Sequence, residues 1–130
     1  MAKGYLMDTN VAIDYIGGNL PQKANDWLDN HIDSDIYISV INKIEILGFQ
    51  TETSEEMQPF EELVDTLKLI NISDTIVNQT ITLRKKYKIK LPDAIIAATA
   101  LVDNLILLSA NEKDFKRITG LQWNNLYKMG

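Results

Sequence analysis

The chain has 130 residues with no cysteine, one histidine (His31) and a formal net charge of −5. The length fits one domain, residues 1–130, and the missing cysteines exclude both a disulfide framework and a thiolate zinc site. A single histidine excludes a two-histidine site for metal-free RNA cleavage, and no stretch approaches the roughly 20 apolar residues of a membrane span. We therefore expect a soluble, cytoplasmic protein with no membrane partner.

The charge is divided unevenly along the chain. Residues 1–65 contain 3 basic and 13 acidic residues, a net charge of −10, whereas residues 66–130 contain 10 basic and 5 acidic residues, a net charge of +5. An acidic total argues against a protein that grips nucleic acid by bulk charge alone. The acidic total is compatible with a protein that binds nucleic acid through a local basic patch and bound metal ions.

The chain begins with a short apolar strand followed by two helices. Residues 5–7 are the predicted strand, and residues 11–16 have a helical pattern that Asn10 would cap. Pro21 opens the next helix, which would bury Trp27 in the core, because aromatic side chains dominate core packing.

A second strand and helix follow from residue 36. Residues 36–38 are β-branched and aromatic, which favours a strand. Ser39 caps a predicted helix over residues 40–47, and Gly48 ends it. The apolar spacing predicts the buried face of this helix: Ile41, Ile44 and Leu47.

The second half of the chain continues to alternate helices with apolar strands. One helix opens at Ser54, and Ser73 or Asp74 caps another that runs to about residue 87. Pro92 stands at the first position of a strongly helix-forming segment. The remaining predicted strands cover residues 69–71 and 105–108 and lie within residues 121–127.

Strands that alternate with helices are typical of βαβ units, so the predicted fold is α/β, with a mainly parallel sheet covered by helices on both faces. In such folds, ligands bind beyond the carboxyl ends of the strands. Acidic residues just after a strand, or at the start of the adjoining helix, are therefore the candidates for chemistry.

Two aspartates fit this description. Asp8 ends the first predicted strand, so its carboxylate would point into the crevice at the sheet edge; the alternative is a cap for the following helix. Asp93 stands in the first turn of the nearly wholly apolar helix that contains residues 94–101, where the helix dipole favours an acid for structural reasons alone. In this topology the helix start and the sheet edge converge, which favours a site residue.

Glu45 lies four residues after Ile41, on or beside the predicted buried face of its helix. An unpaired buried carboxylate is costly, and a metal ion or a basic partner would offset that cost; the alternative is a solvated position at the edge of the face. Another polar segment begins at Ser109, directly after residues 105–108, and leaves the same sheet edge. Its candidates for the site are Asn111 and Asp114.

Carboxylates without cysteine or histidine ligands would form a hard-oxygen site, for which Mg²⁺, or Mn²⁺ as a substitute, is the appropriate ion. Such an ion lowers the pKa of a bound water and neutralises the leaving oxygen in phosphodiester hydrolysis. Without a cation, clustered carboxylates repel one another and raise their pKa values. If the acids converge, this repulsion disfavours a purely structural cluster.

A basic run precedes Asp93, with five of the thirteen basic residues inside seven positions. It either contacts a phosphate backbone beside the acids or forms a solvated helix C-terminus, where cations complement the dipole. Lys113, Lys116 and Arg117 could extend the patch. The five candidates for contact with a phosphate backbone are Arg84, Lys85, Lys86, Lys88 and Lys90.

Four segments of the chain form a recognisable set of motifs in a fixed order. The most specific is the run Pro-Asp-Ala-Ile-Ile-Ala-Ala-Thr-Ala at residues 92–100. The others are Leu-Met-Asp-Thr-Asn at residues 6–10, Ile-Ser-Val-Ile leading to Glu45, and Leu-Leu-Ser-Ala-Asn leading to Asp114. Taken in order, these segments resemble the PIN domain and are most similar to its VapC-type toxin branch, and the resemblance covers nearly the whole chain.

The resemblance implies a single PIN domain, a three-layer sandwich that acts as a Mg²⁺-dependent endoribonuclease toxin. It assigns Asp8, Glu45 and Asp93 as the core acids that hold the ion, with Asp114 or Asn111 at the fourth position. It also implies RNA as the substrate, a homodimer, and a cognate VapB-like antitoxin that neutralises the toxin. The residues expected to orient the acids are Thr9, Asn10, Ser39 and Ser109.

Two other functions stay open. A phosphohydrolase acting on small phosphate esters would use a similar acidic edge, although enzymes that form an aspartyl-phosphate often need a second Asp where this chain has Asn10. A catalytically inactive PIN-fold binding module would keep the fold without cleaving RNA. Metal dependence and an RNA assay on an Asp8 variant separate the three functions.

Overall fold

The structure is a computed structural model that describes residues 2–49 and 51–129. Its strands are β1 (Gly4–Met7), β2 (Ile36–Ser39), β3 (Lys68–Ile70), β4 (Leu105–Leu108) and β5 (Trp123–Asn124). Its helices are α1 (Thr9–Gly17), α2 (Gln22–His31), α3 (Val40–Leu47), α4 (Ser54–Thr66), α5 (Asp74–Lys86), α6 (Leu91–Val102), α7 (Glu112–Phe115) and the 3-10 helix η1 (Leu126–Lys128).

The strands form one five-stranded sheet in the order β3-β2-β1-β4-β5, and every pair in it is parallel. Strand β1 is central, with Met7 opposite Leu108 of β4 and Tyr5 opposite Ile36 of β2. The carboxyl ends of β1, β2 and β4 therefore lie along one edge of the sheet, as the α/β prediction requires.

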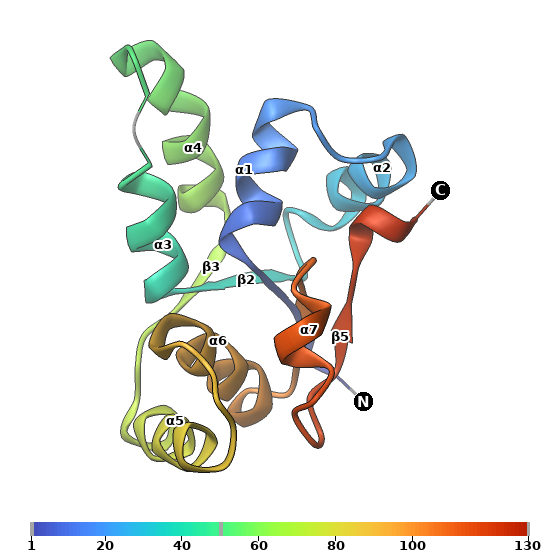
Figure 1. Cartoon of the computed structure of the whole chain (residues 1–130). Helices are drawn as coiled ribbons and strands as arrows, with labels where there is room; N and C mark the ends of the chain where they lie inside the picture. Colours follow the sequence, from blue (N-terminus) through green and yellow to red (C-terminus); the bar gives the residue numbers. More distant parts are fainter. Residues whose placement is uncertain (1, 50, 130) are drawn as a thin grey trace.

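Helices cover both faces of the sheet, so the predicted three-layer sandwich is confirmed. Figure 1 shows α1 to α4 on one side and α5 with α6 on the other. The strand side chains alternate between the two cores, as the two-residue period dictates. Met7 and Leu108 pack with α1, α2 and α4, whereas Leu6 and Leu107 pack with α5 and α6.

Several helix starts differ from the sequence prediction by one or two residues. Helix α1 begins at Thr9, because the cap is Asp8 and not Asn10. Pro92 is the second residue of α6, not the first, and Ser73 rather than Asp74 caps α5. Trp27 is only half-buried, because it packs against the edge of the core and not within it, with its ring stacked on His31 at 4.1 Å between centroids.

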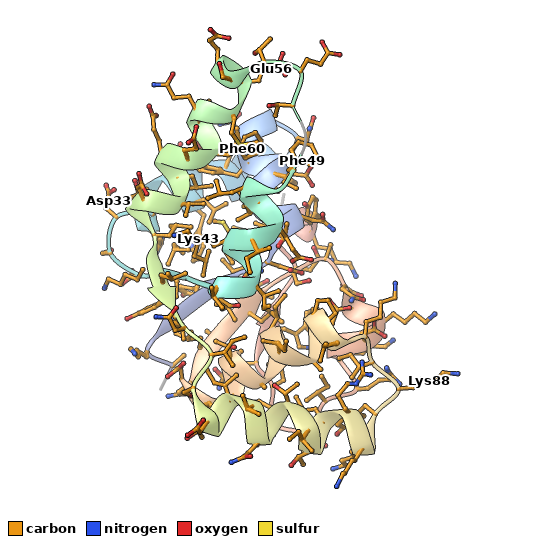
Figure 2. The ribbon with its side chains drawn as sticks, turned by 90° about the vertical axis from the view of Figure 1, so that its left-hand side faces the viewer. Asp33, Lys43, Phe49, Glu56, Phe60 and Lys88 are labelled. Carbon is orange, nitrogen blue, oxygen red and sulfur yellow. The ribbon has the colours of Figure 1, made fainter. Side chains whose placement is uncertain are left out.

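The buried face predicted for α3 is wrong at Ile44, whose side chain is 63% exposed. The helix buries Asn42 and Ile46 instead, and Ile41 packs into the opposite core with α6. The reason is that α3 lies at the border between the layers, in contact with α1 and α4 on one side and α6 on the other. Figure 2 shows α4 running back beside α3, and Phe60 of α4 lies 5.8 Å from Phe49 between ring centroids.

Within the part of the chain that the structure describes, no helix has the length and apolar character needed to cross a membrane.

Candidate active site

The centre of the site is Asp8, which follows β1 at the carboxyl edge of the sheet. Its Oδ1 accepts a hydrogen bond from the backbone N–H of Thr9 at 2.9 Å, and its Oδ2 accepts one from the Ser109 hydroxyl at 2.7 Å. Asp8 therefore caps α1, as the alternative interpretation expects, and its other carboxylate oxygen is bonded to the residue that follows β4. Burial raises the pKa of Asp8, which these hydrogen bonds oppose.

Asp93 joins Asp8 from the first turn of α6 and is half-buried. Its pKa is raised, first by burial and then by the negative charges of Asp8, Asp114 and Glu45, whereas Lys90 lowers it. The fold thus brings the other three predicted acids close enough to act on this carboxyl. Like charges that gather in this way disfavour their own ionised forms unless a cation joins them.

Glu45 reaches this edge from the exposed side of α3, so the expectation that it sits on a buried face is wrong. Its Oε1 accepts a hydrogen bond from the Thr9 hydroxyl at 2.7 Å. The same Thr9 oxygen accepts a hydrogen bond from Nδ2 of Asn42 at 3.2 Å. A threonine at the start of α1 therefore connects Glu45 to the buried part of its own helix.

Asp114 and Asn111, the two candidates for the fourth position of the site, contact each other. The Asn111 side-chain amide donates to Oδ2 of Asp114 at 3.1 Å, and Arg117 donates to Oδ1 at 3.2 Å. The Asn111 backbone N–H in turn donates to the Ser109 hydroxyl at 3.0 Å. Asp114 thus supplies the charge that acts on Asp93, and Asn111 orients it.

The donor set fits a hard, oxygen-preferring cation such as Mg²⁺, because the converging groups are all carboxylates. Among residues 2–49 and 51–129, no three acidic, histidine or cysteine side chains lie close enough to ligate one ion together as they stand. Mg²⁺ commonly keeps several waters and takes only one or two carboxylates from a protein. Asp8 and Asp93, whose charges repel each other, are candidates for that role.

A groove of about 690 Å³ opens beside the acids, lined by Lys88, Ile89, Lys90, Lys113, Asp114 and Arg117. Four of these residues are basic and one is an acid of the site, so cationic side chains border the carboxylate cluster directly. Figure 2 shows Lys88 projecting outward from the loop that follows α5. Lys113 and Arg117 join the two lysines from α7 and the turn after it.

The predicted basic run is only partly in this groove. Lys88 and Lys90 line it, whereas the Arg84 guanidinium donates to the Ile89 carbonyl at 3.0 Å and so braces the loop. Lys86 lies over the Tyr87 ring at 5.4 Å, and Lys85 is exposed on the last turn of α5. The last turn of α5 thus fits the alternative of a solvated helix end.

Of the four residues expected to orient the acids, two bond to a predicted site acid and the other two have different partners. Thr9 and Ser109 contact Glu45 and Asp8 directly. Ser39 instead caps α3 by accepting the N–H of Ile41 at 2.9 Å. Asn10 is exposed, and in the described residues its hydrogen bond to another element runs from the Tyr127 hydroxyl to its backbone carbonyl, at 3.4 Å.

Sequence reasoning missed Asn42, which is completely buried although it is polar. A signal was present, since Ser39 followed three residues later by a side chain that can accept a hydrogen bond is the spacing of a capping box. The structure has that box, with the Ser39 N–H donating to Oδ1 of Asn42 at 3.0 Å.

The chain matches the PIN domain family over residues 5–121 and therefore belongs to that family. Among solved structures, a toxin–antitoxin complex from Klebsiella pneumoniae is 32% identical, with 97% of this chain and 100% of that chain covered and a TM-score of 0.77. VapBC-1 from nontypeable Haemophilus influenzae is 28% identical, over 95% of this chain and 98% of that one, with a TM-score of 0.76. VapBC2 from Rickettsia felis, bound to a DNA fragment from its promoter, is 25% identical over 93% and 97%, with a TM-score of 0.80.

None of the curated proteins compared with the chain matches it. The family match and the VapBC structures confirm the resemblance to the PIN domain and to its VapC-type branch that the sequence motifs predict.

We predict that Asp93→Asn raises the melting temperature at pH 7 by a few degrees, because it removes a charge that burial and three neighbouring acids disfavour. The folded-state pKa of Asp93 lies above its ordinary value of 3.8. The protonated form therefore favours the fold below that value, and this contribution is lost as the pH rises through the folded-state pKa.

The gain in melting temperature should accordingly be largest at pH 7 and vanish below about pH 3.8. Thermal unfolding followed by circular dichroism between pH 3.5 and 7.5 measures it. Glu61→Gln, which removes one exposed carboxylate from α4, is the matched control and should change little. A gain that is independent of pH would contradict this account of the site.

Proposed function

We propose that this chain is a Mg²⁺-dependent endoribonuclease toxin of a toxin–antitoxin pair that works in the cytoplasm as a single PIN domain. The observation that carries the proposal is the convergence of three further carboxylates on Asp93, directly beside a groove lined by lysine and arginine. Such a pair of features suits a substrate that carries phosphates. The acids would hold the cation, and the basic groove would bind the neighbouring phosphates of the strand.

In this proposal Asp8 and Asp93 hold the ion, while Glu45 and Asp114 bind and orient its waters. When bound, Mg²⁺, or Mn²⁺ in its place, would lower the pKa of a water and neutralise charge at the scissile phosphate. The Ser109 hydroxyl donates to Oδ2 of Asp8 and so restrains the orientation of that carboxylate. Lys90, which lowers the pKa of Asp93 and lines the groove, would contact a phosphate of the bound strand.

The toxin role and its partner rest on the similar structures. The Klebsiella pneumoniae structure is described as a toxin–antitoxin complex, and the Rickettsia felis and Haemophilus influenzae structures as VapBC. By analogy, the proposed partner is a VapB-like antitoxin that neutralises this chain. A small-ester phosphohydrolase and an inactive binding module are the alternatives that a cleavage assay distinguishes.

We predict discrete cleavage of a structured-RNA pool by the purified chain in Mg²⁺ or Mn²⁺, none in EDTA, and at least a ~100-fold loss of rate in Asp93→Asn. Gel electrophoresis of end-labelled RNA measures the rate, and Glu61→Gln serves as the surface control. Calorimetry with Mn²⁺ tests the metal site without relying on activity. Expression of the wild-type chain should arrest growth, and expression of Asp93→Asn should not.

Cleavage that persists in EDTA or in Asp93→Asn would contradict the acidic site. Metal-dependent hydrolysis of small phosphate esters without RNA cleavage would favour the phosphohydrolase. Mn²⁺ binding with neither hydrolysis nor growth arrest would favour the inactive module.

We further predict that Lys88→Gln and Lys113→Gln weaken RNA binding through the basic groove. Each removes one cation from the groove wall, so the slope of log affinity against log salt should fall by about 0.7 for each single-strand phosphate that is no longer neutralised. Fluorescence anisotropy with labelled RNA in the Asp93→Asn background measures binding without cleavage. Lys23→Gln on α2 is the matched control, and a slope that falls equally in that variant would contradict the assignment.

The predicted homodimer has a suitable surface on α5 and α6. An apolar groove of about 230 Å³ is lined by Ile72, Val77, Thr80, Ile81, Leu91 and Ile95, and three of these residues are 43–53% exposed. Asp74 and Lys85 stand at the two ends of the same face of α5. In an antiparallel contact across a two-fold axis, Asp74 of one copy would face Lys85 of the other, which favours a second copy as the occupant.

Ile81→Glu should convert the dimer to a monomer, because it buries two unpaired carboxylates against the apolar groove. Ile44→Glu changes an even more exposed isoleucine on α3 and should leave the dimer intact. Analytical ultracentrifugation separates the two states. A monomeric wild-type chain, or a dimer that survives Ile81→Glu, would contradict the proposed surface.

A further inference from the structure

Asn42 occupies an unusual position for a polar side chain, because it is 0% exposed on a helix whose other buried residue is Ile46. Both ends of its amide are bonded. Its Oδ1 accepts the backbone N–H of Ser39 at 3.0 Å, and its Nδ2 donates to Oγ1 of Thr9 at 3.2 Å. The orientation of the amide follows from this pattern, since a backbone N–H can only donate and must therefore meet the oxygen.

The orientation of Asn42 fixes the direction of the next hydrogen bond. The Thr9 hydroxyl has one proton, and it receives the Asn42 amide proton on its oxygen. Its own proton is therefore free for Oε1 of Glu45, which it meets at 2.7 Å. The three hydrogen bonds run in one direction, from the Ser39 backbone side of α3 to the carboxylate at the acidic edge.

Capping of α3 accounts for only half of this arrangement. The capping box needs an acceptor at the third helical position, which the oxygen of Asn42 supplies, and Glu or Gln more often supplies it. The buried N–H₂ group serves no part of the cap. Its partner is on α1, 33 residues away in sequence.

Glu45 needs such a restraint, because it is exposed and the charges of Asp8 and Asp93 repel it. A free glutamate side chain in that field would turn toward solvent. We infer that Asn42 is a positioning residue that, through the Thr9 hydroxyl, holds the Glu45 carboxylate at the acidic edge. The inference deepens the proposed function and rests on it only for the claim that Glu45 then serves the metal site.

The first test reverses which groups donate and which accept in the two hydrogen bonds made by the Thr9 hydroxyl, and it needs neither metal nor RNA. Asn42→Asp keeps the shape and the cap of α3, but it presents an acceptor to Thr9, whose single proton cannot serve two carboxylates. The melting temperature should fall by several degrees. Adding Glu45→Gln supplies a donor at the far end, so the direction can reverse and most of the loss should be recovered.

The matched control adds Glu45→Ala to Asn42→Asp, because it relieves charge repulsion equally but provides no donor. Recovery that is clearly greater with Glu45→Gln than with Glu45→Ala supports the link from Asn42 to Glu45. Equal recovery, or Glu45→Gln having the same effect with and without Asn42→Asp, would overturn it and leave Asn42 as a cap alone.

The second test asks whether the link serves the metal site. Thr9→Val keeps the shape of the side chain but removes the hydroxyl, and it should weaken Mn²⁺ binding in calorimetry about tenfold or more. Thr9→Ser should restore binding close to the wild-type value. A loss of melting temperature in Thr9→Val without a change in Mn²⁺ affinity would overturn the claim that the positioned Glu45 serves the metal site.

The two tests keep this inference distinct from the proposed function. A wild-type chain that binds no Mn²⁺ would refute the metal site and the claim that Glu45 contributes to it. The Asn42→Asp and Glu45→Gln variants would still decide whether Asn42 positions Glu45.

Discussion

The acidic edge depends on the parallel pairing of β1 with β4. The backbone N–H of Asp8 donates to the Leu108 carbonyl at 3.0 Å, so the pairing continues past the end of β1. Asp8 and Ser109 therefore leave the sheet as neighbours, and the Ser109 hydroxyl can meet the carboxylate. A register shifted by one residue would turn the side chains of the shifted strand to the opposite face, separate Asp8 from Ser109 and dismantle the cluster.

The acidic first half and the basic second half of the sequence both contribute residues to the site around Asp8. The acidic half supplies Asp8 and Glu45, and the basic half supplies Asp93 and Asp114 together with the lysines of the groove. The acids act against the stability of the fold, because burial and mutual repulsion raise the pKa values of Asp8 and Asp93. An arrangement that costs stability at one place is typical of a functional site and is offset by the two apolar cores on either side of the sheet.

The parts of the structure set by strong local patterns can be predicted from the sequence. The apolar run that forms β4 has the predicted limits, and the position of Asp8 and Asp93 at strand and helix ends follows from βαβ topology. A helical period puts Glu45 on a buried face because it assumes one core, whereas α3 borders two. The sequence also cannot show which residues of the basic run line the groove, because the hydrogen bond from Arg84 to the Ile89 carbonyl depends on how the loop packs.

The short outer strands have a consequence for assembly. At the two edges of the sheet, β3 has three residues and β5 has two, and β3 begins with Lys68. Edges of this kind offer few free backbone groups to another strand, which protects a protein against sheet extension and fibril-like stacking. The proposed contact through α5 and α6 would therefore leave the edges of the sheet unused, so that association of two copies would not extend the sheet.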